Sequence, residues 1–138
     1  MATSVSTIKG MNPELAAKLK DERITNTDHL LEAAMKPGER RELAKKVGVG
    51  ASELLELVNR ADLARIRGIG DVFANLLEDA GVDSVKELAR RRPDHLHAAL
   101  LKANEASQRV GRVPNEEMVA GWIDEAKRLR ENNESVEE

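Results

Sequence analysis

The chain has 138 residues, of which 41% are hydrophobic and 34% are charged, and its net charge is −3. This length suits one domain or two small units that share a core, and the composition excludes an intrinsically disordered protein. One Phe, one Trp and no Tyr disfavour a β-sandwich or barrel, while the absence of Cys excludes disulfides, thiolate nucleophiles and cysteine-based zinc sites.

Membrane and targeting signals are absent from the printed sequence. No apolar run approaches the roughly 20 residues of a membrane span, and the first ten residues lack the charged and apolar regions of a signal peptide. We therefore expect a cytoplasmic protein with no membrane partner. The acidic excess lies in residues 105–138, which hold five basic and nine acidic residues. Residues 131–138 are predicted to be an acidic disordered tail, and residues 1–7 an N-terminal tail.

Helix signals follow one another along the chain, and no segment alternates with a period of two, so the predicted fold class is all-α. Proline suits a first helical turn, Gly a helix end, and Asn, Asp, Ser or Thr an N-cap. These signals predict helices, in chain order, over 13–22, from Asn26 or Thr27, over 37–47, from Ser52 to Asp62, over 71–80, from Asp83 or Ser84, over 93–108 and over 115–129.

The chain contains an internal repeat. Residues 8–31 align without a gap on residues 66–89, at an offset of 58, with identities at Ile8/Ile66, Gly10/Gly68, Ala16/Ala74, Leu19/Leu77, Asp21/Asp79 and Leu30/Leu88. Later the match resumes at an offset of 65, where Leu54, Leu57, Val58 and Ala61 align with Val119, Trp122, Ile123 and Ala126. The repeat predicts a first unit over 8–63 and a second over 64–130, packed as one compact helical bundle. The second unit has about seven extra residues before its last helix.

The most informative stretch runs from Leu63 to Gly70 and ends in Gly68-Ile69-Gly70, with Ala74 four residues later. Gly68 permits a tight turn, and Gly70 leaves the backbone bare where the next helix begins. Ile69 is expected to point into the core, and Ala74 to let two helices approach closely. This stretch resembles the helix-hairpin-helix superfamily, whose pattern is a helix, Gly-hydrophobic-Gly and a second helix.

A finer resemblance covers nearly the whole chain. The residues that carry it are 57–70, 76–88, Val113, Pro114, Val119, Trp122 and Ile123. They resemble a bacterial family known only as a domain of unknown function and described as tandem helix-hairpin-helix. This resemblance implies the fold and leaves the function open.

Nucleic-acid binding is the leading functional hypothesis, because DNA-binding members of the superfamily donate backbone N–H groups from the turn and helix start to a phosphate. The resemblance and the basic residues give these candidates for contact with a DNA or RNA backbone: Lys9, Gly10, Asn12, Arg65, Arg67, Gly68, Ile69, Gly70, Arg90, Arg91 and Arg92. The last three also fit a solvated helix end, where the helix dipole favours cations. Because the chain is acidic overall, such binding would be local and independent of sequence.

Departures from the DNA-binding pattern favour an alternative, a protein-interaction or adaptor module that binds no nucleic acid. Asp71 follows Gly70 where a basic or hydroxyl residue is usual, and we expect it to cap the helix and occupy its positive end. In the first turn Asn12 replaces the second Gly, as a residue that tolerates left-handed geometry, and Glu14 stands where a basic residue is usual. For an adaptor, the extended segment 93–113 is the best candidate surface.

Catalytic and cofactor motifs are missing from the sequence. There is no carboxylate pair, nucleophile–base pair or metalloprotease motif, and no strand precedes Gly68-Ile69-Gly70 as a dinucleotide site requires. His95 and His97 are two residues apart, which points them to different faces of a helix. Trp122 lies among apolar residues and is predicted to be core. We therefore expect no enzyme activity, metal, cofactor or small-molecule substrate.

Overall fold

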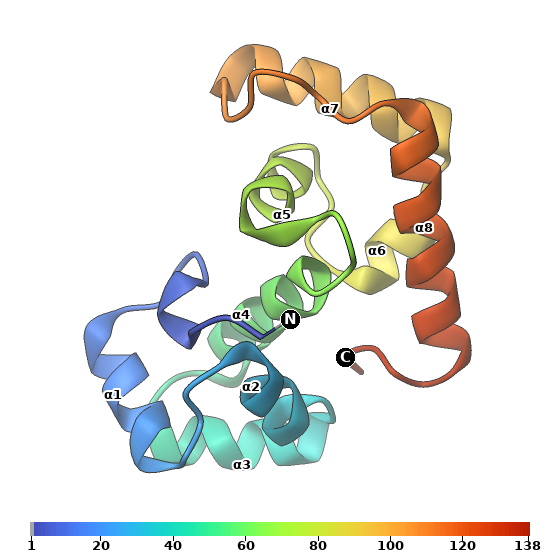
Figure 1. The fold of residues 1–138 in the computed structure, drawn as a ribbon. Coiled ribbons are helices and arrows are strands. Elements are labelled where there is room, and N and C mark those ends of the chain that lie inside the picture. The colour runs from blue at the N-terminus through green and yellow to red at the C-terminus, as the bar shows by residue number, and fades with distance from the viewer. Residues whose placement is uncertain (1) are drawn as a thin grey trace.

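The computed structural model describes residues 2–138, which form eight α-helices, one 3-10 helix and no strand beyond an isolated bridge between Ser4 and Asn26 (Figure 1). The all-α prediction is confirmed. In chain order the elements are η1 (Val5–Thr7), α1 (Pro13–Asp21), α2 (Thr27–Ala34), α3 (Pro37–Val47), α4 (Ala51–Ala64), α5 (Gly70–Asp79), α6 (Val85–Ala89), α7 (Pro93–Ser107) and α8 (Glu116–Glu131). Within the described residues no helix combines the length and apolar character needed to cross a membrane.

Local sequence signals set most of the helix starts. The side chains of Asn26, Ser84 and Asn115 each accept a hydrogen bond from the backbone N–H three residues later, at 2.8, 3.1 and 2.8 Å, which satisfies one free donor of α2, α6 and α8. Proline occupies the first position of α1, α3 and α7. The prediction for Ser52 is wrong: α4 begins one residue earlier, with Gly50 as its N-cap and no side-chain cap.

Two apolar clusters form the core, and α4 contributes to both. The first cluster gathers buried residues from Val5 to Ala61, and the second gathers those from Leu63 to Leu129. Leu57 of α4 belongs to the first cluster and Leu63, near the end of the same helix, to the second. Burial of these side chains is the main source of stability. Because α4 contributes buried residues to both clusters, it links the two halves of the chain.

Several backbone features next to α1 recur next to α5. Gly10 and Gly68 have φ of +94° and +93°, and the residue after each donates its N–H to the carbonyl three positions earlier, at 3.0 Å in both cases. Past the helix ends, the N–H groups of Ile24 and Val82 donate to the carbonyl five positions earlier, at 2.9 and 2.8 Å. The two turns and the two helix ends therefore share these backbone hydrogen bonds.

The C-terminal residues pack against the body of the protein in the structure, whereas the composition of 131–138 predicts an acidic disordered tail. We call residues 132–138 the C-terminal strap. Val136 is 8% exposed and joins the first apolar cluster; its N–H donates to Asp62 Oδ2 at 2.9 Å, and the N–H of Glu137 donates to the Met35 carbonyl at 3.0 Å. Figure 1 shows the chain returning from α8 toward α2 and α4. A single apolar anchor and buried hydrogen bonds hold a segment whose composition alone indicates disorder.

The N-terminal residues are also part of the fold rather than a loose tail. Val5 is 3% exposed and belongs to the first apolar cluster. Its N–H donates to the Thr25 carbonyl at 3.1 Å, and the N–H of Thr27 donates to the Thr3 carbonyl at 2.8 Å. Residues 3–7 therefore cover the connection between α1 and α2.

Candidate binding site

The second turn has the geometry that the Gly-Ile-Gly sequence predicts. Gly68 and Gly70 have φ of +93° and +59°, and Ile69 is 2% exposed, which places its side chain in the core. A Cβ on Gly68 would lie 3.1 Å from Nε1 of Trp122. Glycine is therefore required at position 68 by backbone conformation and by the close approach of the indole.

The start of α5 is open. It has no side-chain cap, so the prediction that Asp71 caps this helix is wrong, because the preceding turn holds Asp71 inside the first helical turn rather than before it. Within residues 2–138, the backbone N–H groups of Gly70, Asp71 and Val72 donate no hydrogen bond. These groups carry the positive end of the helix dipole, and the Asp71 carboxylate lies in the same turn.

The first turn is closed. Asn12 has φ of −125° and caps α1 by accepting a hydrogen bond from the Leu15 N–H at 2.8 Å; the expectation of left-handed geometry there is wrong, because the cap requires extended backbone. Arg60 covers the turn by donating from Nη1 to the Lys9 carbonyl at 2.8 Å. A Cβ on Gly10 would lie 2.8 Å from that same Nη1. A phosphate would have to displace Arg60.

The Arg60 guanidinium also forms a bidentate ion pair with the Glu78 carboxylate of α5, which we call the Arg60–Glu78 fork. Its Nε and Nη2 donate to the two carboxylate oxygens at 2.9 and 3.0 Å, and Lys9 Nζ lies 3.5 Å from the same carboxylate. The hydrogen bond from Arg60 is the main reason that the pKa of Glu78 lies below its usual range. Lys9 thus belongs to an ion-pair network that connects the first turn, α4 and α5. Nothing in the sequence pattern pairs residues so far apart.

Arg65 holds a buried carboxylate and the C-terminal strap. Its Nε donates to Asp62 Oδ1 at 2.7 Å, and its Nη2 donates to the Glu134 carbonyl. Asp62 is fully buried, and burial raises its pKa although Arg65 acts in the opposite direction. Arg65 is therefore a structural residue, since moving it to a phosphate would leave a buried carboxylate unpaired.

The Arg90–Arg92 run is largely neutralised by neighbouring carboxylates. Arg90 and Arg91 lie 3.8 and 3.6 Å from Glu87, Arg92 lies 3.2 Å from Asp94, and Arg91 also donates to the Gly81 carbonyl at 3.1 Å. Among the predicted cations, only the exposed Arg67 has no carboxylate within ion-pair distance in residues 2–138. The structure does not gather these residues into one free basic surface.

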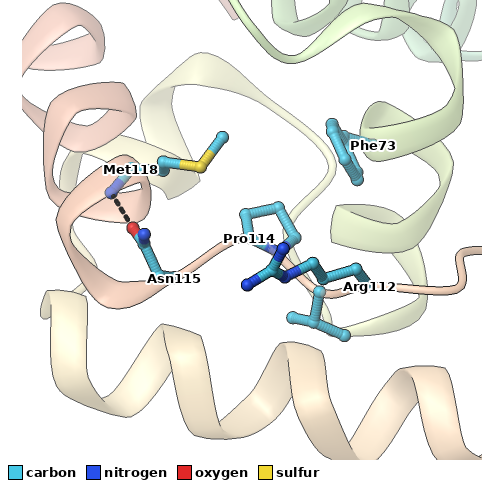
Figure 2. A pocket seen from close by; sticks show the side chains of 6 residues that line it. Phe73, Arg112, Pro114, Asn115 and Met118 are labelled. Atoms are coloured by element: carbon cyan, nitrogen blue, oxygen red, sulfur yellow. Dashed lines mark hydrogen bonds between the residues drawn. The ribbon is translucent and has the colours of Figure 1, made fainter.

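A pocket of about 360 Å³ lies beside α5 and the loop that enters α8 (Figure 2). It is lined by Phe73, Arg112, Val113, Pro114, Asn115 and Met118. In Figure 2, Phe73 and Met118 stand on opposite sides of the pocket, with Pro114 between them and Arg112 beside it. The Phe73 ring packs at 5.7 Å, centroid to centroid, against Trp122, which also contacts the second turn. The pocket is therefore built onto that turn.

The lining of this pocket is apolar with one cation. Met118 is 45% exposed, and the exposed Val72 lies next to Phe73 in the chain but does not line the pocket. The Asn115 amide is occupied as the cap of α8, and Arg112 is the charged residue of the lining. The sequence indicates the region through the extra residues after 93, but Phe73 and Met118 give no signal, because either fits the apolar face of a helix.

Metal binding finds no support in the described part of the chain. No three His, Asp or Glu side chains there converge on a point where they could hold a metal ion.

Comparison with known proteins places the chain in a family. The family described as Domain of unknown function (DUF4332) matches residues 9–129, which include both turns, all eight α-helices as far as residue 129, and the pocket. No curated protein and no solved structure matches the chain. Since the match spans most of the sequence, the chain belongs to the DUF4332 family.

Proposed function

We propose that the chain is a non-enzymatic helix-hairpin-helix module of two related units, which binds a partner protein through the pocket beside its second turn. The repeat is supported by the shared hydrogen bonding of the two turns. It is also supported by burial, since Leu19 and Leu77 are both 0% exposed, and Leu57 and Trp122 are 2% and 4% exposed. Aligned positions are thus buried to a similar degree in the two clusters.

The observation that carries the binding proposal is a difference between the two units. Leu15, Gly48 and Val49, which align with Phe73, Val113 and Pro114, line a hollow of about 110 Å³ in the first unit. The corresponding pocket of the second unit is about 360 Å³. The equivalent place is therefore smaller in the first unit than in the second.

The lining also changes character between the units. The first hollow is bordered by the ion pair of Glu14 and Lys18, 3.4 Å apart, whereas the second has Met118 and Phe73 at its walls. Apolar, partly exposed pockets of this kind bind the anchor side chains of partner proteins. With Arg112 as the cation of the lining, we propose a partner segment that carries a large apolar side chain next to carboxylates.

Peptide binding tests this site. The probe is a short labelled peptide with one leucine followed by two aspartates, measured by fluorescence anisotropy. Met118→Asp should weaken binding by about tenfold or more, because a carboxylate enters the apolar pocket and repels the probe. Leu101→Asp is the matched control: Leu101 is also 45% exposed but does not line the pocket. Equal binding by both variants would refute the site.

Phosphate binding at the second turn is a second candidate function. It is favoured by the open N–H groups at the start of α5 and by Arg67, which has no carboxylate within ion-pair distance in residues 2–138. We expect any such binding to be salt-sensitive, to weaken on Arg67→Ala without unfolding, and to strengthen on Asp71→Lys. Labelled duplex and single strands, titrated at two salt concentrations, test this directly; absence of binding at low salt would eliminate the candidate.

A further inference from the structure

A second hollow of about 360 Å³ lies in the first unit, between the end of α1, α2 and α3. Its floor is apolar and its rim is charged: the lining residues are Ile24, Ala33 and Leu43 on the floor, and Glu22, Glu39, Glu42 and Lys46 on the rim. Figure 1 shows α3 and α7 on opposite sides of the molecule. This hollow, which we call the acidic groove, is therefore distinct from the pocket of the second unit.

The rim of the acidic groove has more negative charge than the protein itself neutralises. Lys46 lies 3.9 Å from Glu22. Glu39 and Glu42 are exposed and have no ion-pair partner within residues 2–138. An occupant of this groove must bring an apolar group for the floor and a positive charge for the rim.

The second unit shows which cation fits. At the offset of 58, Arg23 aligns with Gly81; when the same offset is continued two residues past the repeat, Ala33 near the end of α2 aligns with Arg91, which follows α6. Arg91 Nη2 donates to the Gly81 carbonyl at 3.1 Å and lies 3.6 Å from the position of a Cβ on that glycine. Arg23 and Gly81 both have positive φ, +65° and +93°. In the second unit, an arginine of the chain itself thus covers the connection between the two helices.

At the aligned position the first unit has an alanine in place of the arginine. Ala33 ends at its methyl group, and the Arg23 carbonyl accepts no hydrogen bond within residues 2–138. We infer that the acidic groove is a second docking site, which accepts an arginine beside an apolar residue from a partner protein. The guanidinium donates to the Arg23 carbonyl and pairs with Glu22 or Glu42. This inference rests on the proposed repeat and adaptor function. The module would then bind an acidic partner segment in the pocket of the second unit and a basic partner segment in the acidic groove.

Peptides that differ in one group test the inference. The probe is a short acetylated peptide with one arginine between two leucines, added to ¹⁵N-labelled full-length protein; the matched peptide has citrulline, which keeps the shape and removes the charge. We expect shift changes at the amides of 22–24, 33 and 39–46, and binding about tenfold tighter for arginine than for citrulline. Equal binding of the two peptides, or shifts elsewhere, would overturn the inference.

Variants separate this site from the pocket of the second unit. Ala33→Arg supplies the missing arginine in cis and should abolish binding of the arginine peptide while leaving the acidic peptide unaffected. Met118→Asp should weaken binding of the acidic peptide by about tenfold or more and leave binding of the arginine peptide unaffected. If Ala33→Arg unfolds the protein, the exposed pair Glu39→Lys and Glu42→Lys takes its place, and should weaken arginine-peptide binding by about tenfold. Undiminished binding in whichever variant folds contradicts the groove as the site.

Discussion

Single side chains decide which turn of this protein is open. Arg60 lies over the first turn because Glu78 holds its guanidinium from the other side. At the second turn the corresponding space is taken by Trp122, which contacts Gly68 but offers no charge. The difference leaves the second turn accessible at its helix start and the first one covered.

The Glu78 carboxylate should contribute to stability in a pH-dependent way. Its pKa is lowered in the fold, chiefly by the hydrogen bond from Arg60, so its contribution is present above the pKa of the unfolded chain and is lost as pH falls through the folded pKa. Glu78→Gln should destabilise the protein by about 1–2 kcal/mol at neutral pH and lose less stability than the wild type on acidification. Urea unfolding at a series of acidic pH values measures this difference.

A surface glutamate provides the control for that comparison. Glu14 is 81% exposed and forms only an i,i+4 pair with Lys18, so Glu14→Gln should change stability by less than about 0.5 kcal/mol. If Glu78→Gln and wild type lost stability in parallel as pH falls, the Arg60–Glu78 fork would not contribute to the free energy of unfolding in solution.

At the scale of elements, the turn before α5 depends on glycine. Gly68→Ala should destabilise the protein by about 1–3 kcal/mol, because φ of +93° is strained for alanine and its Cβ would approach the Trp122 indole at 3.1 Å. Gly121, inside α8, meets nothing within 4 Å, and Gly121→Ala should stabilise by about 0.5–1 kcal/mol. Thermal unfolding distinguishes the two; a neutral Gly68→Ala would contradict the turn geometry.

Sequence signals predict elements better than they predict helix entries. The caps at Asn26, Ser84 and Asn115 are read correctly because each residue satisfies a donor of the helix that follows it. The expected cap at Asp71 fails because the left-handed Gly70 already belongs to the helix. Residue identity gives a capping tendency, whereas the turn before the helix decides whether the cap position is reached.

At the scale of the whole molecule, the C-terminal strap ties α8 to the first apolar cluster. Val136→Asp should destabilise the protein by about 2–3 kcal/mol, since it removes a buried side chain and introduces a charge near the buried Asp62 carboxylate. Glu138→Gln, which breaks only a partly exposed pair with Lys86 at 3.6 Å, should change stability little. Equal melting temperatures for the two variants would mean that the strap is not held in solution.

The strap also shows where sequence reasoning reaches its limit. The all-α fold could be predicted, because helix periodicity and helix punctuation are local. The strap, the Arg60–Glu78 fork and the Arg65–Glu134 contact join residues that are 18 or more positions apart, and no local pattern records them. The sequence therefore indicates the candidate cations but not the residues with which they pair in the fold.

We propose that the second turn supports a protein-binding pocket rather than a phosphate site. The most direct measurement adds the acidic leucine peptide and a short DNA duplex in turn to the same ¹⁵N-labelled protein at low salt. We expect the peptide to shift the amides of Phe73, Arg112, Val113 and Met118, and the duplex to shift none of them in a saturable way. Saturable, salt-sensitive shifts at Gly68–Val72 with the duplex, and none with the peptide, would contradict the claim.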